Sequence, residues 1–256
     1  MKDLFSVAGK VALVTGGTRG IGLMMARGLV ANGATVYVAS RKAEACEAAA
    51  KELSPLGTCF GIPASLGSEA GCNALAEELA GREERLHVLV NNAGANWGAP
   101  LAEYPDEAWD KVLALNVKAV FQLTRALLPR LEAAASPEDP ARVINVGSID
   151  GLQVPAMETY AYSASKAAVH HLTRTLARRL APSHVTVNAV APGPFESKMM
   201  AATLDQFHDA IVASCPLGRI GRPEDMAGIA VYLASRAGAY VTGAVIPIDG
   251  GISTCK

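Results

Sequence analysis

The sequence lacks the charge imbalance that marks proteins that bind nucleic acid or acidic membrane surfaces. Lys and Arg together number 23, Asp and Glu number 24, and the formal net charge is -1. No basic run stands out along the chain, so the sequence carries no electrostatic footprint for a polyanion. We expect neither nucleic acid nor a membrane among the partners of this protein.

Patterns for metal, disulfide or serine-hydrolase chemistry are also missing. The five cysteines are far apart and form no C-x-x-C, so we expect reduced thiols rather than a zinc site or a disulfide framework. The five histidines include no H-x-x-x-H, and the chain contains no G-x-S-x-G. The sequence therefore predicts no metal site and no serine nucleophile.

Long hydrophobic runs are absent as well. No uninterrupted apolar segment approaches the roughly 20 residues that cross a bilayer. The start of the chain shows no apolar leader segment, and a cytoplasmic location is the expectation. Half of the 256 residues are hydrophobic and 18% are charged, which favours a well-buried globular protein. We predict a single domain over residues 1–256, a length that α/β folds reach as one unit.

Short β-branched runs alternate with alanine- and leucine-rich stretches along the whole chain, which is typical of βαβ units and a parallel sheet. Val88–Val90 and Val143–Val146 are apolar on both alternating faces, as expected where helices cover both sides of a sheet. We predict an α/β fold with a doubly wound, Rossmann-type, mostly parallel sheet of about seven strands and helices on both faces. The expected strands are Lys10–Thr15, Ala34–Ala39, Thr58–Ile62, Leu86–Asn91, Arg142–Ser148, His184–Val190 and Val245–Ile248.

Glycine and proline punctuate the helices between these strands. Gly33 is expected to stop the helix over Ile21–Asn32, and Pro223 is expected to begin another helix. Pro129 should kink or end the helix that carries Phe121–Leu128.

A glycine-rich turn follows the first expected strand and opens a helix. Its sequence from Thr15 to Gly22 has the form T-G-x-x-x-G-x-G. Glycine tolerates positive φ and lets the backbone approach a pyrophosphate, which the free N–H groups at a helix N-terminus can bind. A purely structural turn is the alternative, but the position between a strand and a helix favours dinucleotide binding. The expected contact residues are Gly16, Thr18, Arg19, Gly20, Ile21 and Gly22.

Several further motifs follow in a fixed order. They are Asn91–Gly94, Asn116 within Leu115–Val117, Ser148, Tyr162-x-x-x-Lys166 and Pro192-Gly193. With the glycine turn, they make nearly the whole chain similar to the short-chain dehydrogenase/reductase family. The segments Ala141–Ser148 and Val245–Gly251 resemble its 3-oxoacyl reductase branch.

The resemblance implies hydride transfer to a ketone, with a 3-oxoacyl thioester as the expected substrate. A polyol or sugar-acid dehydrogenase of the same fold is the alternative enzyme. A non-catalytic NADP-binding protein is a further alternative, which the intact Ser148, Tyr162 and Lys166 disfavour. Because substrates vary widely within one fold, the acyl length and carrier stay open at this stage.

The resemblance also implies roles for single residues. Tyr162 would be the general acid for reduction, with its pKa lowered by the Lys166 ammonium and by the oxidised cofactor. Ser148 would bond the substrate oxygen, Lys166 would also hold the nicotinamide ribose, and Asn116 would bind a water on a proton path. Taken singly, Ser148 could instead cap a strand end, Lys166 could be a solvated helix residue, and Asn116 could bond to backbone inside a helix.

Further cofactor contacts are implied at the ends of later strands. Where the family often has an Asp for the adenine, this chain has Ala64-Ser65-Leu66, so the Ser65 hydroxyl or backbone N–H groups would serve. The remaining expected contacts are Leu66, Asn92, Ala93, Gly94, Tyr162, Lys166, Pro192, Gly193 and Ser197.

The end of the second strand bears on the choice of cofactor. An NAD-binding strand usually ends in an acid that bonds the ribose hydroxyls, whereas this one ends Ser40-Arg41-Lys42. Arg41, Ser40 and Arg19 could bind a 2′-phosphate, although Arg41 and Lys42 could also be solvated residues entering a helix. We predict NADP(H) as the cofactor.

Two tyrosines compete for the role of general acid, because Ser148 precedes Tyr160 by 12 residues and Tyr162 by 14. On a helix, Lys166 shares a face with the residue four positions earlier, which is Tyr162, and is turned about 120° from Tyr160. The helix periodicity therefore favours Tyr162.

A segment over residues 194–216 is expected to cover the substrate. Its apolar residues could equally be core packing: Phe195, Met199, Met200, Leu204, Phe207 and Ile211. The resemblance further implies a homotetramer or homodimer, with the helix that carries Tyr162 and the helix before it in one interface.

Overall fold

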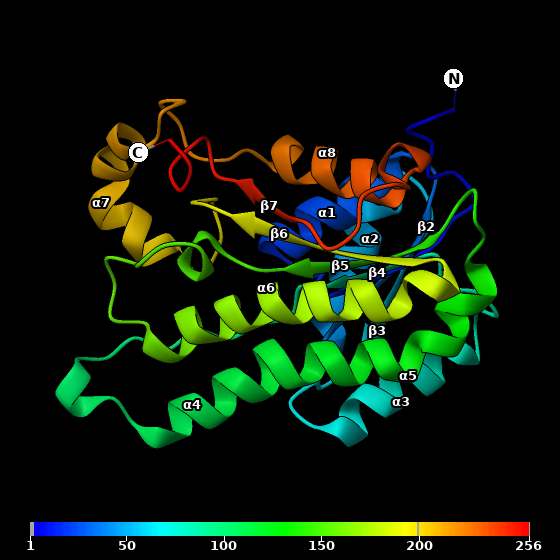
Figure 1. Ribbon diagram of the computed structural model, residues 1–256, viewed down its shortest axis with the longest axis horizontal. Coiled ribbons are helices and arrows are strands. Elements are labelled where there is room, and N and C mark those ends of the chain that lie inside the picture. The colour runs from blue at the N-terminus through cyan, green and yellow to red at the C-terminus, as the bar shows by residue number, and fades with distance from the viewer. Residues whose placement is uncertain (1–2, 199, 256) are drawn as a thin grey trace.

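The computed structural model describes residues 3–198 and 200–255 and contains one seven-stranded sheet. All strand pairs are parallel, in the order β3-β2-β1-β4-β5-β6-β7 (Figure 1). The doubly wound α/β prediction is confirmed, and each expected strand is present with its ends shifted by at most two residues. The strands are β1 Val11–Thr15, β2 Thr35–Ser40, β3 Cys59–Pro63, β4 Val88–Asn91, β5 Ala141–Val146, β6 Val185–Pro192 and β7 Val245–Ile248.

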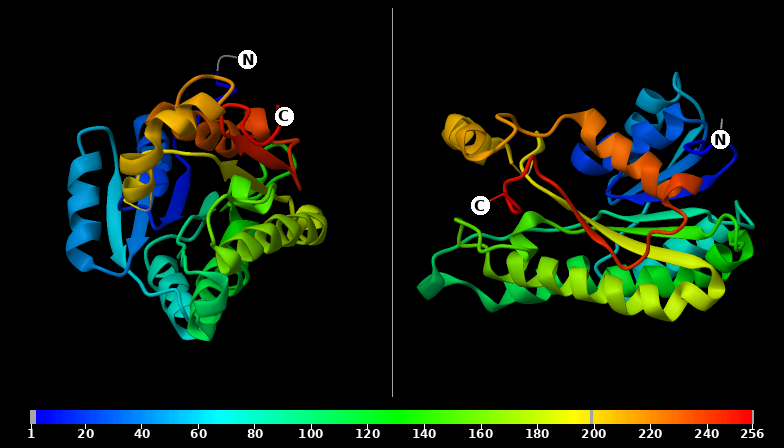
Figure 2. Two further views of the ribbon diagram at one scale, coloured as in Figure 1. Left: turned by 90° about the vertical axis from the view of Figure 1, so that its left-hand side faces the viewer. Right: turned by 45° about the horizontal axis from the view of Figure 1, so that its top comes forward.

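Helices cover both faces of the sheet (Figures 1 and 2), and buried side chains form a separate core on each face. Buried side chains of α1, α2 and α8 pack on one face, and those of α3, α5 and α6 pack on the other. β1 shows why the strand is apolar throughout, because Ala12 and Val14 enter the first core and Leu13 enters the second. The helices are α1 Gly20–Ala31, α2 Ala43–Leu53, α3 Glu69–Ala80, α4 Asp106–Leu113, α5 Ala119–Ala134, α6 Tyr160–Leu180, α7 Ala201–Ser214 and α8 Pro223–Ala234.

Two local expectations need correction. Of the two outcomes expected at Pro129, an end of the helix is excluded and a kink stays a prediction: α5 continues through Pro129 to Ala134, because Leu131 beyond the proline is fully buried in the core that α5 shares with α3. β5 ends at Val146 rather than at Ser148. Ser148 instead precedes a short 3-10 turn, Ile149–Gly151, which packs on α6.

The helix before α6 extends well beyond Phe121–Leu128, the stretch that was expected to be helical. α4, a π-helical turn at Ala114–Lys118 and α5 form one continuous helix, Asp106–Ala134. It is the one helix in the described ranges that is long and apolar enough, by length and composition, to cross a membrane. Its Leu123, Leu127 and Leu131 are buried in the core beneath the sheet.

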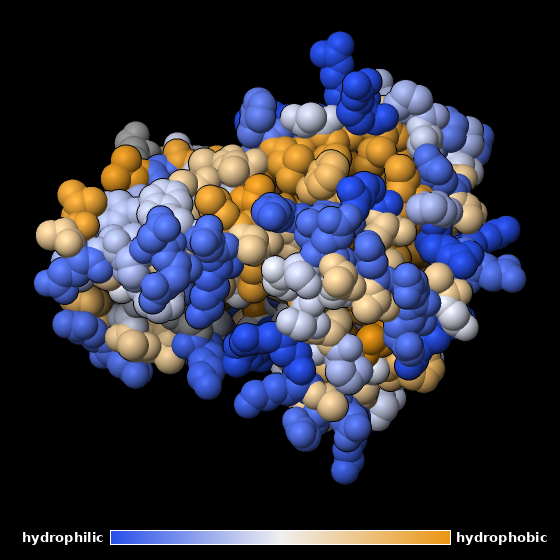
Figure 3. Space-filling model, turned by 90° about the horizontal axis from the view of Figure 1, so that it is seen from below, coloured by the Kyte–Doolittle hydropathy of each residue, from blue (hydrophilic) through white to orange (hydrophobic). Residues whose placement is uncertain are grey.

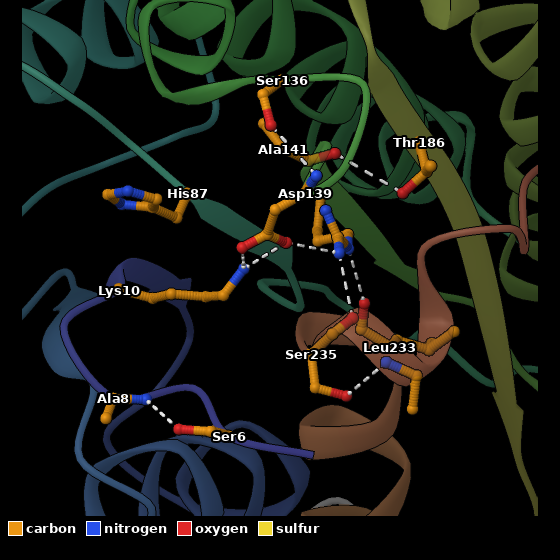
Figure 4. Close-up of polar contacts among 12 residues, drawn as sticks. Ser6, Ala8, Lys10, His87, Ser136, Asp139, Ala141, Thr186, Leu233 and Ser235 are labelled. Atoms are coloured by element: carbon orange, nitrogen blue, oxygen red, sulfur yellow. Dashed lines mark hydrogen bonds and ion pairs between the residues drawn. The ribbon is translucent and has the colours of Figure 1, made fainter. Parts of the chain in front are cut away.

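A buried guanidinium joins three distant parts of the fold. Figure 4 shows its partners Asp139, Leu233 and Ser235, together with Lys10, which bonds Asp139. Arg142 at the start of β5 is 1% exposed and donates from Nε to the Leu233 carbonyl (3.1 Å) and from Nη2 to the Ser235 carbonyl (2.9 Å) at the end of α8. Its Nη2 also bonds Asp139 Oδ1 at 2.9 Å, and Lys10 Nζ donates to the same carboxylate at 2.7 Å. Asp139 therefore balances two buried cations.

Removal of this carboxylate should destabilise the fold. Asp139→Ala leaves Arg142 and Lys10 without their counter-charge, and we expect the free energy of unfolding to fall by about 2–4 kcal/mol in urea titrations at pH 7. The neighbouring exposed Glu138→Ala is the matched control and should change it by less than about 0.5 kcal/mol.

The same carboxylate predicts a pH dependence. Burial acts to raise the pKa of Asp139, but Lys10 and Arg142 outweigh burial and hold the pKa below its ordinary value of 3.8. The carboxylate thus stabilises the fold above about pH 4, and this contribution is lost as the pH falls through the lowered pKa. The difference in unfolding free energy between wild type and Asp139→Ala should shrink in acid, and a constant difference down to pH 2 would contradict this account.

Candidate functional site

The loops singled out from the sequence all lie at one edge of the sheet. Parallel strands end together, and the glycine turn, Ser40, Ser65, Asn92, Ser148 and Gly193 each lie at or just beyond the carboxyl end of a different strand. Strand order reverses between β1 and β4, which is where open α/β sheets form their ligand crevice. The ends face the side on which α7 lies (Figures 1 and 2).

The glycine turn between β1 and α1 has the backbone that glycine allows. Gly16 and Gly20 have φ of +62° and +52°, a region that other residues rarely adopt. A Cβ at Gly16 would lie 2.7 Å from the side-chain amide of Asn92. α1 begins at Gly20, no side chain caps it, and its first turn holds no acid, so its N–H groups remain available to an anion. Thr18 and Ile21 lie within this turn, partly buried.

Hydrogen bonds tie the end of β1 to the loop after β4. The Thr15 hydroxyl accepts from the backbone N–H of Asn92 (2.9 Å) and of Ala93 (3.0 Å), and Asn92 Nδ2 donates to the carbonyls of Thr15 (2.9 Å) and Gly16 (3.1 Å). Asn92 therefore has a structural role, because its side chain holds the glycine turn in place. Gly94 lies next to the Asn116 side chain. The sequence analysis missed Thr15 in this role.

Cationic side chains lie at the outer end of the crevice. Arg41 follows β2 and Arg19 precedes α1; both are exposed, and their guanidinium groups make no hydrogen bond or ion pair within the described part of the chain. Ser40 is partly buried, with Oγ 3.3 Å from the Cys46 sulfur. No acidic residue lies between the end of β2 and Glu44, so the end of β2 suits an anionic group.

The remaining expected cofactor contacts are arranged along the same edge. Ser65 is exposed after β3, whereas the Leu66 side chain is buried in the core. Pro192 ends β6, and the Gly193 N–H bonds the Ile248 carbonyl at 3.0 Å. Ser197 lies across from the glycine turn, since a Cβ at Gly20 would be 3.3 Å from the Cβ of Ser197.

Ser148, Tyr162 and Lys166 converge between the end of β5 and the first turns of α6. The Ser148 hydroxyl lies near enough to Tyr162 to lower the pKa of its phenol. Lys166 Nζ lies 5.4 Å from the centroid of the Tyr162 ring and donates to the Val146 carbonyl at 2.8 Å. Lys166 is 6% exposed, so it is not the solvated helix residue of the alternative interpretation.

Burial sets the proton affinities of these groups. It raises the pKa of Tyr162 to about 12, with the Asp150 charge adding to the rise and the Ser148 hydroxyl opposing it. Among the protein's own groups burial of the phenol dominates, and the lowering expected with the oxidised cofactor beside Tyr162 stays a prediction. Burial also lowers the pKa of Lys166 to about 8, against the effect of Asp150. Tyr162 is a proton donor at neutral pH.

Tyr160 belongs to a different set of contacts. Its hydroxyl donates to Glu158 Oε1 at 2.7 Å, and its ring meets Tyr104 edge-on with centroids 5.3 Å apart. The Tyr104 hydroxyl in turn accepts from the backbone N–H of Ala161 at 3.3 Å, at the start of α6. Tyr160 thus packs at the entrance of the helix, while Tyr162 faces Ser148 and Lys166.

Asn116 is buried in the π-helical turn between α4 and α5. Its Oδ1 accepts from the Ala95 N–H (2.8 Å), and its Nδ2 donates to the Ala95 carbonyl (2.9 Å) and to Ser165 Oγ (3.0 Å). Both amide hydrogens are committed to the protein, which favours the alternative of a mid-helix polar group over a water-binding side chain. Asn116 connects the loop after β4 to the residue before Lys166.

The segment 194–216 stands partly apart from the sheet. Phe195 is buried and pairs with Gly221, so this residue is core. None of the 14 residues of α7 is buried, all of them being described, and Phe207 interrupts the helix with φ of −128° and is 46% exposed. Met200, Leu204 and Ile211 are half-buried, and Met199 lies outside the described residues.

A cavity of about 640 Å³ lies between this segment and α1. It is lined by Gly20, Met24, Ser197 and Val212 and by the stretch from Gly218 to Pro223. It borders the glycine turn but does not reach Ser148 or Tyr162. We regard the convergent strand ends, rather than this cavity, as the site of chemistry.

Asp150 is a site residue that the sequence analysis missed. It lies in the turn after Ser148, and its backbone N–H donates to Ser148 Oγ at 3.1 Å. Burial raises the pKa of its carboxyl, and Lys166 opposes this rise. In the sequence, Asp150 could have been found as the acidic residue two positions after Ser148.

Comparison with known proteins agrees with this geometry. A family model described as enoyl-(acyl carrier protein) reductase matches residues 16–253. The rhamnolipids biosynthesis 3-oxoacyl-[acyl-carrier-protein] reductase of Pseudomonas aeruginosa is 53% identical over 98% of this chain and 99% of that protein.

Solved structures agree over the same length. A Pseudomonas aeruginosa RhlG/NADP active-site complex superposes with a TM-score of 0.95 at 51% identity, covering 99% of this chain and 100% of that one. A putative NAD(P)-dependent gluconate 5-dehydrogenase from Beutenbergia cavernae with bound NADP gives a TM-score of 0.90 at 38% identity, over 97% and 98% of the two chains. With its glycine turn, its Ser148, Tyr162 and Lys166 and these relatives, the chain belongs to the short-chain dehydrogenase/reductase family.

Proposed function

We propose that this protein is an NADPH-dependent reductase that converts the ketone of a 3-oxoacyl thioester to an alcohol. The observation that carries the proposal is the convergence of Ser148, Tyr162 and Lys166 beside a glycine turn, in a chain 53% identical to a 3-oxoacyl reductase. The enzyme is proposed to be one domain over residues 1–256, with the segment 194–216 covering the substrate.

The residues at the crevice fit NADPH. The uncapped N-terminus of α1 and the glycine backbone suit its pyrophosphate, while Arg41, Ser40 and Arg19 suit its 2′-phosphate. Ser65 and Leu66 would border the adenine. On the nicotinamide side, Asn92, Ala93 and Gly94, then Pro192, Gly193 and Ser197, line the ends of β4 and β6. When bound, the cofactor supplies the hydride for the reduction.

The chain's own residues supply the proton and hold the substrate oxygen. Negative charge develops on that oxygen as the ketone is reduced, and the hydroxyls of Ser148 and Tyr162 can both donate to it. Tyr162, with its pKa of about 12, gives up its proton only as this charge forms. Lys166 stabilises the resulting tyrosinate and would also bond the nicotinamide ribose, and Asn116 acts through Ala95 and Ser165 as a positioning residue.

The runner-up function is a polyol or sugar-acid dehydrogenase, favoured by the similarity to the gluconate dehydrogenase structure. Absorbance at 340 nm separates the two: acetoacetyl thioesters of CoA and of acyl carrier protein should oxidise NADPH, while a panel of polyols and sugar acids should not reduce NADP. Binding of NADP without turnover of any of these would favour the non-catalytic alternative.

We also propose a homotetramer or homodimer in the cytoplasm, with α5 and α6 in one interface. Apolar side chains gather on part of the surface seen from the side of α4, α5 and α6 (Figure 3), and Phe121 on α5 is 44% exposed. All five cysteines are free thiols, which suits a reducing compartment. Light scattering of the purified protein tests the assembly.

Arg41→Asp should weaken the preference of the enzyme for NADPH over NADH. The change replaces a charge-assisted bond to the 2′-phosphate by repulsion, so KM for NADPH should rise about tenfold or more, with KM for NADH changed much less. The adjacent exposed Lys42→Asp is the matched control and should have a smaller effect. Equal changes for both cofactors in Arg41→Asp would remove this residue from the phosphate site.

Substitution of Tyr162 and of Tyr160 should affect kcat very differently. Tyr162→Phe removes the proton donor, and we expect kcat to fall about 100-fold or more while NADPH still binds, as followed by cofactor fluorescence. Tyr160→Phe loses only the bond to Glu158 and should stay within about tenfold of wild type. The opposite order would show that Tyr160 is the acid.

A further inference from the structure

The turn that carries Ser148 folds around the imidazole of His170. This histidine is 3% exposed and lies on α6, one helical turn beyond Lys166. A Cβ at Gly147, just before Ser148, would lie 2.1 Å from His170 Nε2, and a Cβ at Gly151, at the end of the turn, would lie 2.8 Å from His170 Cε1. The ring therefore packs directly against the glycines on both sides of Ser148.

Hydrogen bonds of the backbone give this turn its shape. The Ser148 hydroxyl accepts from the Asp150 N–H at 3.1 Å, and the Ser148 carbonyl accepts from the Gly151 N–H at 3.1 Å. Before the turn, the Gly147 N–H donates to the Val190 carbonyl of β6 at 2.7 Å. None of these bonds joins the turn to α6, so its position on that helix depends on packing.

Two side chains of α6 contact consecutive residues at the end of β5. Lys166 Nζ donates to the Val146 carbonyl, and the His170 ring packs against Gly147. Tyr162, Lys166 and His170 are spaced four residues apart, so each is turned only about 40° from the one before along the helix. Together the two contacts set where the next residue, Ser148, lies relative to Tyr162.

The His170 ring contributes its flat shape to this packing. Neither ring nitrogen has a hydrogen-bond partner among the residues that the structure describes. Burial lowers the pKa of His170 to about 4, against the weaker effect of the Gly151 backbone, so the ring is neutral at neutral pH. The imidazole therefore fills the slot between the two glycines as an uncharged plane, and titration has no part in its role.

We propose that His170 is a positioning residue: its ring, packed between Gly147 and Gly151, fixes the Ser148 turn on α6 so that the hydroxyls of Ser148 and Tyr162 converge on one substrate oxygen. The inference rests on the proposed reductase function. Hydrogen-bond donors that are held rigidly stabilise the charge that develops on this oxygen, and a small displacement of one donor slows the reaction. Because the same hydroxyls serve both directions, loss of the ring slows reduction and oxidation by the same factor.

His170→Ala tests the role in folded protein, well below the melting temperature. We expect kcat for reduction to fall about tenfold or more, with kcat/KM for reduction and for oxidation lowered by similar factors. The Kd for NADPH should stay within about threefold of wild type, because the glycine turn and Arg41 follow other strands. Leu176→Ala truncates a buried side chain further along α6 and is the matched control. It should lower the melting temperature and leave kcat within about twofold.

Alanine at each glycine tests the contact itself. In Gly147→Ala the new Cβ meets the His170 ring, and the next nearest atom is a carbonyl oxygen at 3.2 Å. We expect kcat/KM to fall about 100-fold, and the added change His170→Ala to recover about tenfold or more. If Gly147→Ala does not fold, the recovery is a folded double variant. Gly151→Ala is the matched control, because its Cβ also meets the Lys166 carbonyl carbon at 2.7 Å, and His170→Ala cannot relieve that clash.

The role of His170 and the reductase function can fail separately. A lower melting temperature of His170→Ala with an unchanged kcat would show core packing only and overturn the role, as would equal recovery, or none, in the two double variants. The function stands in those cases if wild type reduces 3-oxoacyl thioesters. If wild type instead oxidises polyols, the reductase function fails, and the same variants test His170 on oxidation. Turnover of neither substrate would remove both.

Discussion

The hydrogen bonds between the ends of β1 and β4 determine how the site is assembled. Through Thr15 and Asn92 they fix the glycine turn against the loop after β4. Asn116 bonds that loop at Ala95 and bonds Ser165 on α6, one residue before Lys166. A continuous set of protein contacts thus joins the expected phosphate end of the crevice to the reacting end. Positioning of this kind lets rigid elements hold reacting groups accurately.

The buried charges of the protein have two different roles. Arg142 at the amino end of β5 has a carboxylate and two carbonyls as partners, so its burial joins β5 to α8 without leaving the charge unbalanced. At the carboxyl end of the same strand, Lys166 is buried with the Val146 carbonyl as its hydrogen-bond partner, and Asp150 is half-buried. There burial shifts pKa values toward the range in which protons move, at a cost in stability. One strand thus carries a stabilising cluster at one end and a reactive one at the other.

Much of the fold could be predicted because strand and helix periodicity are local properties. The seven β-branched runs identified the strands, and Pro223 and Gly33 lie at helix ends as expected. Pro129 was wrong as a helix end because burial of the following turn outweighs the lost hydrogen bond. The rise that burial gives the pKa of Tyr162 could not be read from neighbouring charges in the sequence, because desolvation depends on the folded surroundings. The partners of Asn116 at Ala95 and Ser165 could not be predicted, because they lie 21 and 49 residues away in the chain.

The sequence by itself determined the alternation of strands and helices, the position of the glycine turn, and the four-residue spacing that puts Tyr162 and Lys166 on one helical face. These follow from backbone geometry within a few residues. Only the tertiary structure decided that Asp139 pairs with Lys10, that Asn116 reaches Ser165, and that Lys166 donates to the Val146 carbonyl. The first two contacts join residues far apart in the chain, and all three depend on how the sheet and helices pack, which no local pattern encodes.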